Sequence, residues 1–398
     1  MVFLKKGGRN VFLIALGVVI FNMEVIAQSP VPSGATVEKV TDGYQFVEGP
    51  LWREPGYLIF SDIPANTVYK WSEAGGKEVF LIPSGNSNGL AADLQDRVLL
   101  AQHGNRRISR IEEDNTEIAL ATHYDNKKLN SPNDIAVKSS GSIYFTDPPY
   151  GINPNQEELG FYGIYCLTPD SNLYLLDNSL SRPNGIVFSP DETKLYVNDS
   201  QARRIYVWDV QNDSTISNRQ LFYTMTGSGS ADGMKADADG NVYSAGPGGV
   251  WILKPDGTLL DRIAVPGQTT NLNWGDTDRK TLYITSGTSV YRIRLNVNVS
   301  RVSEGAYPSI PDDIKLYDNY PNPFNAQTRI SYGLSGSGLV KLSILNLLGK
   351  RIITLVNKNQ EKGEYSIIFD AAGLATGIYF YQLEVGNFRM AKKMLLIQ

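Results

Sequence analysis

Cysteine and histidine are scarce in this chain of 398 residues, which contains one cysteine, Cys166, and two histidines, His103 and His123. A single cysteine cannot form an intrachain disulfide, and so few thiols and imidazoles exclude a cysteine-based zinc site and histidine-rich metal chemistry. Any bound metal must therefore be held by oxygen atoms. Positive charge is sparse as well. With a net charge of −4 and no dense Lys/Arg block, the chain lacks the basic surface that nucleic-acid binding requires.

Long apolar runs are missing, apart from one near the N-terminus. A basic segment within residues 1–10 precedes roughly a dozen apolar residues, fewer than the ~20 that a membrane-spanning helix needs. Residues 25–27 offer the small side chains that a signal peptidase reads. We therefore predict a signal peptide at residues 1–27, with an uncleaved anchor as the alternative. No later run is long enough to span a bilayer, so we expect no transmembrane segment in the mature chain.

Glycine, proline and aromatic residues are plentiful, with 37 Gly, 20 Pro, 22 Tyr and 14 Phe. This balance is typical of many short strands joined by tight turns. Two strand-like runs recur six times at spacings of about 40–50 residues, which is the size of one four-stranded propeller blade. We predict an all-β fold with a six-bladed β-propeller at residues 28–296, closed by a strand near residues 35–40. The first runs lie at 57–62, 98–102, 143–147, 195–200, 242–246 and 282–286, and the second runs at 67–71, 106–111, 163–167, 203–208, 248–253 and 289–293.

A polar residue precedes the first run of every repeat, about 15 residues before its end. Blades radiate from one axis, so these six side chains are expected to converge on one mouth of the central channel. Their oxygens suit a hard cation, and Ca²⁺ fits better than Mg²⁺ because it tolerates irregular geometry. Turn chemistry is the alternative, because Asn and Asp favour turns, although it does not account for a glutamate. The six residues are Glu48, Asn88, Asn133, Asn184, Asp232 and Asn271.

The C-terminal part of the chain reads as a separate unit. Residues 297–313 are polar, contain two prolines and predict a linker, and residues 314–398 contain short β-rich runs typical of a small Ig-like β-sandwich. The motifs LYDNYPNPFNAQTRISY, LLGKRI, GLATGIYFYQLEVG and KKMLLIQ follow in order and closely resemble the type A C-terminal sorting domain of the type IX (Por) secretion system.

This resemblance implies export through the periplasm of a Gram-negative, Bacteroidota-type bacterium. It makes the type IX machinery a partner and predicts a secreted or cell-surface location. The alternative is an ordinary β-sandwich that serves as a binding accessory.

The repeat region resembles the senescence-marker-protein (regucalcin)/gluconolactonase family of six-bladed propellers. The matching motifs are EGPLW, HGNRRISR, SPNDI, YFTDPPYG, RPNGIVFSPDETKLYV and ADGMKADADGNVY. In that family the corresponding glutamate, two asparagines and aspartate hold one divalent cation. The resemblance therefore implies Glu48, Asn133, Asn184 and Asp232 as metal ligands, with Ca²⁺ favoured and Zn²⁺ or Mg²⁺ as alternatives.

The resemblance also implies hydrolysis of a small-molecule lactone such as glucono-1,5-lactone. A divalent cation would polarise the lactone carbonyl. We expect Asp232 to accept a proton from the attacking water, with Glu48 as second candidate, and His103 to contact substrate or shuttle a proton. The residues expected to line the substrate pocket are Asn88, Asn271, Asp147 and Tyr150.

Two other functions remain open. The same metal site could hydrolyse another lactone or a phosphotriester, or the propeller could bind a sugar or a partner without catalysis. Residues 85–89 also match the GxSxG motif of serine hydrolases. That motif requires a strand–turn–helix context, which a β-repeat lacks, so we expect no catalytic role for Ser87.

Overall fold

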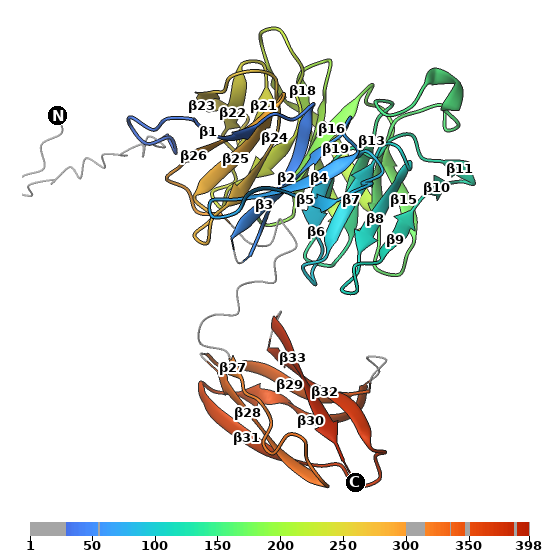
Figure 1. Ribbon diagram of the computed structural model, residues 1–398, viewed down its shortest axis with the longest axis vertical. Coiled ribbons are helices and arrows are strands. Elements are labelled where there is room, and N and C mark those ends of the chain that lie inside the picture. The colour runs from blue at the N-terminus through green and yellow to red at the C-terminus, as the bar shows by residue number, and fades with distance from the viewer. Residues whose placement is uncertain are drawn as a thin grey trace, which may run out of the picture.

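The computed structural model describes residues 29–299 and 315–397, except residues 55, 335, 347–350 and 386–387. The expected signal peptide at residues 1–27 and most of the expected linker lie outside the described residues. Regular structure in the described part is β-strand, apart from one 3₁₀ turn at Pro154–Gln156 (Figure 1). The all-β prediction is thereby confirmed. In the same part of the chain, no helix has the length and apolar character needed to cross a membrane.

Residues 38–294 contain six four-stranded antiparallel sheets that follow one another along the chain (Figure 1). Strand order within a sheet follows chain order, except that the last sheet takes its outer strand from the N-terminus. The first three sheets are β2 (Val47–Arg53), β3 (Tyr57–Asp62), β4 (Thr67–Ser72) and β5 (Gly76–Leu81); β6 (Ser87–Ala92), β7 (Val98–Gln102), β8 (Arg107–Ile111) and β9 (Glu117–Ala121); and β12 (Ile135–Val137), β13 (Ile143–Asp147), β14 (Gly163–Leu167) and β15 (Leu173–Asp177). The next three are β16 (Pro183–Phe188), β17 (Lys194–Asp199), β18 (Arg204–Asn212) and β19 (Thr215–Thr224); β20 (Met234–Ala236), β21 (Val242–Gly246), β22 (Gly249–Leu253) and β23 (Leu259–Ala264); and β24 (Thr269–Gly275), β25 (Thr281–Ser286), β26 (Ser289–Arg294) and β1 (Glu38–Asp42). A short hairpin, β10 (His123–Tyr124) and β11 (Lys127–Lys128), lies between the second and third sheets along the chain.

The first strands of the six sheets contact one another in a closed series. Strand β2 contacts β6, the contacts continue through β12, β16, β20 and β24, and β24 contacts β2 again. Strand β1 pairs with β26 in the last sheet, so the N-terminal strand joins the sheet formed by the end of the repeat region. It begins three residues after the start of the strand expected at 35–40.

Acidic turns connect the first and second strands of several sheets. The Asp93 carboxylate accepts hydrogen bonds from the backbone N–H groups two and four residues further along, at 2.9 Å each, and Asp237 does the same at 3.0 and 2.9 Å. A short acidic side chain thus satisfies backbone donors that the strands leave free. This explains why polar clusters separate the strand patterns in the sequence.

Glycines let neighbouring first strands approach closely. The N–H of Gly89 donates to the backbone oxygen of Asn133 at 2.8 Å, and a Cβ at Gly89 would lie 2.6 Å from that oxygen. A Cβ at Gly185 would lie 2.3 Å from the backbone oxygen of Asp232. Each glycine follows a polar residue of the repeat. The close contact between this glycine and the backbone of the next first strand therefore also sets the distance between neighbouring polar residues.

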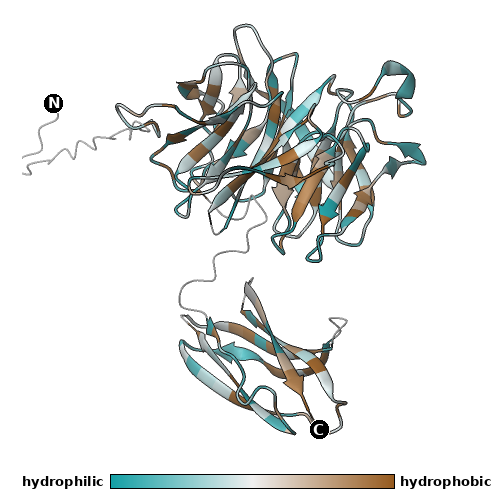
Figure 2. Ribbon diagram, in the orientation of Figure 1, coloured by the Kyte–Doolittle hydropathy of each residue, from teal (hydrophilic) through white to brown (hydrophobic). Residues whose placement is uncertain are grey.

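Apolar side chains fill the space between adjacent sheets in several clusters. One of them joins Tyr243 and Val250 to Leu272 and Trp274 of the following sheet. Figure 2 shows apolar residues concentrated in the strands and hydrophilic residues in turns such as the β10–β11 hairpin. All five tryptophans of the chain lie between residues 52 and 274, so tryptophan fluorescence reports on this part alone.

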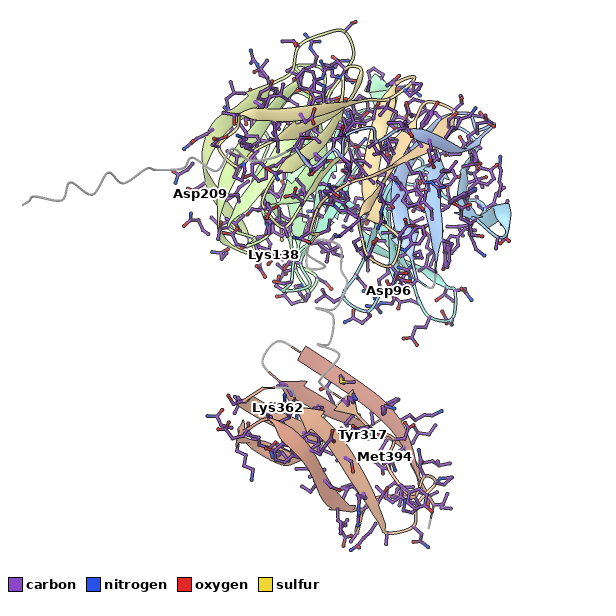
Figure 3. The ribbon with its side chains drawn as sticks, turned by 90° about the vertical axis from the view of Figure 1, so that its left-hand side faces the viewer. Asp96, Lys138, Asp209, Tyr317, Lys362 and Met394 are labelled. Carbon is purple, nitrogen blue, oxygen red and sulfur yellow. The ribbon has the colours of Figure 1, made fainter. Side chains whose placement is uncertain are left out.

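Residues 315–397 form two further antiparallel sheets with one shared apolar cluster, to which both sheets contribute. Met394 is fully buried there, whereas Tyr317 is partly exposed (Figure 3). The Tyr381 hydroxyl donates to the backbone oxygen of Tyr317 at 2.8 Å. The strands are β27 (Lys315–Leu316), β28 (Gln327–Leu334) and β31 (Gly363–Asp370) in one sheet, and β30 (Arg351–Gln360), β29 (Gly338–Leu345), β32 (Gly377–Val385) and β33 (Phe388–Leu396) in the other.

Replacing Gly185 by alanine should destabilise the repeat region. The new methyl group would collide with the backbone of Asp232, and such overpacking typically costs about 1–3 kcal/mol. At roughly 2–4 °C for each kcal/mol, the tryptophan-monitored melting temperature should fall by several degrees. Gly75→Ala is the matched control, because its Cβ would meet only the flexible side chains of Glu78 and Ser72. Equal melting temperatures for the two variants would contradict the packing argument.

Candidate functional site

The six polar residues of the repeat, called the ring residues below, all lie at the start of a sheet's first strand. Four of them are within β2, β6, β16 and β24, and the other two stand two residues before β12 and β20. All six are buried, with between 3% and 7% of their surface exposed. Because these first strands contact one another in a closed series, the ring residues stand at the starts of neighbouring strands, and their convergence on one centre stays a prediction. They are Glu48, Asn88, Asn133, Asn184, Asp232 and Asn271.

Four ring residues interact with one another. Burial raises the pKa of both Glu48 and Asp232, while the side chain of Asn271 is close enough to oppose that rise at Glu48 and the side chain of Asn184 opposes it at Asp232. The two carboxylates also repel each other. Asn133 is held through its backbone, whose N–H donates to Thr146 at 2.8 Å.

A third carboxylate, Asp134, belongs to this centre, although the sequence did not indicate it as a site residue. Asp134 is 2% exposed, and its Oδ1 accepts the N–H of Ile135 at 3.0 Å. It lies close enough to raise the pKa of both Glu48 and Asp232. The available signal was an exception in the repeat: an aspartate stands after Asn133, where four of the other five ring residues are followed by glycine.

Burial and mutual repulsion make the centre hard to ionise. Burial, reinforced by Asp134, raises the pKa of Glu48 to about 8. Burial, Glu48 and Asp134 together raise the pKa of Asp232 well above its usual range. The opposing charge at this centre is the buried ammonium of Lys235, which acts on Glu48 and Asp134. Three carboxylates facing one ammonium leave two negative charges uncompensated when all four groups are ionised.

Two ring oxygens are buried without any hydrogen-bond partner. They are Asn184 Oδ1 and Asp232 Oδ1. Buried acceptors are nearly always satisfied by protein or water, so two orphaned oxygens beside uncompensated carboxylates fit a divalent cation. Within residues 29–299 and 315–397, no three Asp, Glu, His or Cys side chains cluster closely enough to hold a metal by themselves. Amide oxygens would therefore have to complete the coordination.

His103 lies beside one ring residue. The side-chain nitrogen of Asn88 donates to His103 Nε2 at 3.2 Å, which assigns the ring proton to Nδ1. Burial lowers the pKa of His103 to about 4, so the imidazole is neutral near pH 7. The loop after β13 packs on it, since a Cβ at Gly151 would lie 2.5 Å from the His103 Cβ.

Tyr150 lies in that same loop and reaches the centre. Burial raises the pKa of its hydroxyl, and Ser200, Asp232 and Asn184 are close enough to affect that pKa as well. The residue remains 38% exposed. Tyr150 is therefore near the ring residues and open to solvent, and its place in a substrate pocket stays a prediction.

Asp147 is placed differently, in the turn scaffold beside the centre. It is fully buried, and its Oδ2 accepts the N–H of Asn130 at 2.8 Å. The last residues of two other second strands, Asp62 and Asp199, hold backbone N–H groups in the same way. This shared pattern identifies Asp147 as a support for the segment that leads into the third sheet.

Ser87 stands in β6 with a strand following it, and its hydroxyl lies 2.9 Å from that of Ser61. The strand–turn–helix context of a nucleophilic serine is absent from residues 85–102, as expected from the sequence.

Comparison with known proteins assigns both parts of the chain. Residues 46–288, more than half of the chain, match the SMP-30/Gluconolactonase/LRE-like region, and the chain belongs to this family. Residues 318–398 match the secretion system C-terminal sorting domain. Both resemblances inferred from the sequence are thereby confirmed.

Individual relatives agree with this assignment. A gluconolactonase of Zymomonas mobilis is 35% identical over 288 residues, which cover 65% of this chain and 81% of the relative. A solved gluconolactonase from Xanthomonas campestris is 33% identical, with a TM-score of 0.63, and the match covers 67% of this chain and 91% of that one. The solved calcium-binding regucalcin of Agrobacterium tumefaciens is 21% identical with a TM-score of 0.59, covers 68% of this chain and 97% of that one, and shares the fold.

The raised pKa of Glu48 predicts a stability that depends on pH when chelator is present. Its pKa is about 8 in the folded protein and about 4.3 when unfolded. The unfolded state therefore loses this proton first. The contribution of Glu48 to the free energy of unfolding is therefore fully present below pH ~4. It is lost as the pH rises towards 8, and the free energy of unfolding falls by about 1.4 kcal/mol for each pH unit.

We expect the tryptophan-monitored melting temperature in chelator to fall between pH 5 and pH 8, and millimolar Ca²⁺ to remove the fall. Glu48→Gln, which cannot ionise, should make the fall smaller, while burial, which also raises the pKa of Asp232, Asp134 and Asp147, accounts for the fall that remains. A wild-type melting temperature that rises or stays constant over this range would contradict the buried-carboxylate argument.

Proposed function

We propose that this protein is an exported, metal-dependent lactonase that opens a sugar lactone such as glucono-1,5-lactone to the aldonic acid. Membership of the SMP-30/gluconolactonase family and the lactonases among its relatives support hydrolysis of a carboxylic ester bond. The observation that carries metal dependence is the pair of orphaned oxygens, Asn184 Oδ1 and Asp232 Oδ1, beside buried carboxylates that repel one another.

The six sheets are proposed to be the blades of a β-propeller at residues 28–296, whose inner strands are the first strands of each sheet. The closed series of contacts from β2 back to β2 supports this arrangement. The ring residues then occupy one mouth of the channel, as equivalent positions of radial blades do.

The ligands proposed for the cation are Glu48, Asn133, Asn184 and Asp232. This donor set is made of oxygen atoms, two from carboxylates and two from amides, which favours Ca²⁺ over Zn²⁺ and Mg²⁺ because calcium accepts carbonyl and carboxylate oxygens in irregular geometry. The calcium-binding relative from Agrobacterium tumefaciens supports the same choice. When bound, such a cation supplies a Lewis acid that polarises the lactone carbonyl.

Carboxylate side chains of the protein then activate the attacking water by accepting its proton. Asp232 is positioned to accept a proton from water as the water oxygen attacks the carbonyl carbon, and Glu48 is the second candidate. The bond from that carbon to the ring oxygen breaks, the ring oxygen takes up a proton and becomes a hydroxyl, and the new carboxylic acid releases a proton to solvent.

The neighbouring side chains are proposed to position the lactone. Asn88 and neutral His103 form one hydrogen-bonded pair at the mouth, Tyr150 borders it from the loop after β13, and Asn271 orients Glu48. With its imidazole uncharged, His103 is suited to contact substrate and poorly suited to act as a base at neutral pH. Asp147 supports this wall from within.

Export is proposed to follow from the two ends of the chain. A signal peptide at residues 1–27 would take the protein into the periplasm, and the sorting domain at residues 314–398, after a linker at 297–313, would address it to the type IX machinery and the cell surface or medium. The match of residues 318–398 to a secretion sorting domain supports this route.

Proton release in weak buffer tests the proposed activity. The full chain, loaded with Ca²⁺, should accelerate the opening of glucono-1,5-lactone above the spontaneous rate, and chelator should abolish the acceleration. Asp232→Asn should lower kcat/KM by at least about 100-fold, because general-base catalysis alone typically contributes 10²–10⁴-fold.

Ser87→Ala is the matched control, since Ser87 is buried in a neighbouring strand and should leave the rate within about twofold of wild type. A folded Asp232→Asn protein with near wild-type activity would overturn the proposed role of Asp232. No activity on any lactone in metal-loaded wild-type protein would redirect the proposal to phosphotriesters, and then to sugar or partner binding.

A further inference from the structure

Arg182 stands next to the ring residues and has no assigned role in the proposed hydrolysis. It immediately precedes β16, two residues before Asn184. The backbone bends at Arg182 and then enters the strand that carries Asn184, so Arg182 lies beside the start of that strand.

The guanidinium of Arg182 is held against a residue of the site. Its central carbon lies 5.3 Å from the centroid of the Tyr150 ring. Burial raises the pKa of Tyr150, and Asp232 and Asn184 are close enough to affect that pKa as well. Tyr150 is therefore near both the guanidinium and two of the proposed metal ligands. The backbone of Arg182 is fixed as well, because its N–H donates to Asp199 Oδ1 at 3.2 Å and its oxygen accepts the N–H of Ser200 at 2.9 Å.

This positioned charge has no carboxylate partner among the described residues. Several arginines of the repeat region are held in ion pairs, as Arg97 is with Asp93 and Glu112, whereas within residues 29–299 the Arg182 guanidinium contacts the Tyr150 ring. A partly buried guanidinium without a carboxylate partner suits an anionic ligand group, because its planar donors match a carboxylate in a bidentate manner.

We propose that Arg182 selects lactones that carry a second acidic group, such as the monolactone of an aldaric acid. This inference rests on the proposed lactonase function and names its substrate class. The lactone carbonyl would lie at the ring residues, while the carboxylate at the far end of the sugar would reach past Tyr150 to Arg182. A neutral aldonolactone offers only a hydroxymethyl group at that end and gains no ion pair.

Two lactones that differ only at this end test the proposal: glucono-1,4-lactone and glucaro-1,4-lactone. Wild-type protein loaded with Ca²⁺ should have the higher kcat/KM for the glucaro-lactone. Arg182→Met, which keeps an unbranched apolar stem but removes the guanidinium, should lower kcat/KM for the glucaro-lactone roughly 10- to 100-fold, as expected for a lost charged hydrogen bond. The same variant should change the value for the glucono-lactone by less than about threefold.

Arg219→Met is the matched control, because that guanidinium also stacks on a tyrosine, Tyr206, at 5.2 Å, but lies on the outer strand β19. It should behave as wild type on both lactones. Equal losses for the two lactones in Arg182→Met would show that Arg182 only supports Tyr150 and would overturn the proposal. Unchanged rates on both lactones would also overturn it.

Equilibrium binding separates this proposal from the proposed activity. Titration calorimetry of the Ca²⁺-loaded full chain with glucarate and gluconate does not depend on turnover. Wild type should prefer glucarate, with a preference that weakens as salt rises and disappears in Arg182→Met. If no lactone is hydrolysed but this preference is found, the lactonase function fails and the acidic-ligand site stands. If lactones are hydrolysed without any preference in rate or binding, the lactonase function stands and the role of Arg182 fails.

Discussion

Repulsion among three buried carboxylates is the interaction on which the rest of the site depends. Glu48, Asp134 and Asp232 are taken out of water and placed within electrostatic reach of one another, with Lys235 as the opposing charge. Burying charge in this way destabilises a protein unless the charge is compensated. The six sheets supply the stability that this centre lacks, because the first strands also carry apolar side chains, such as Leu272 and Trp274, that pack in clusters between sheets.

The close approach of the first strands fixes the positions of the ring residues. At Gly89 and Gly185 the backbone of the next sheet occupies the place of a side chain, so the distance between neighbouring ring residues is set by backbone contact. Asp62, Asp147 and Asp199 then hold the segments that lead into the first strands. The orphaned oxygens of Asn184 and Asp232 are held in position by a scaffold that does not depend on a ligand, and this is the preorganisation that metal sites and catalytic sites require.

The repeat made the architecture and most of the centre predictable. Strand pairs, polar turns and the ring residues recur at fixed spacing, so one alignment of the chain with itself predicts the six sheets and the six buried positions. Asp134 escaped because an aspartate after Asn133 has the same turn chemistry as the glycines at equivalent positions. Only the structure shows its carboxylate buried within electrostatic reach of Glu48 and Asp232. Asp147 was placed at the pocket because it ends a strand near the mouth, whereas its side chain is used by the backbone, as Asp62 and Asp199 indicate by repetition. Sequence analysis did not single out Arg182, because its proposed role depends on a contact with Tyr150, which lies more than 30 residues away in the chain.

Charge connects the two proposals. Without a cation, burial and mutual repulsion raise the pKa of Glu48 and Asp232, and whatever negative charge they carry would oppose the attraction of Arg182 for an acidic lactone. A bound divalent cation balances the charge of the ionised carboxylates, and the attraction between the guanidinium and an anion is then unopposed. Binding of cation and of acidic lactone must then favour each other, and by thermodynamic linkage the effect is reciprocal: an acidic ligand tightens the cation by the same factor. A neutral lactone also contacts the site through its carbonyl, but it has no carboxylate to interact with Arg182. The charge of the substrate would therefore determine how strongly the protein retains its metal.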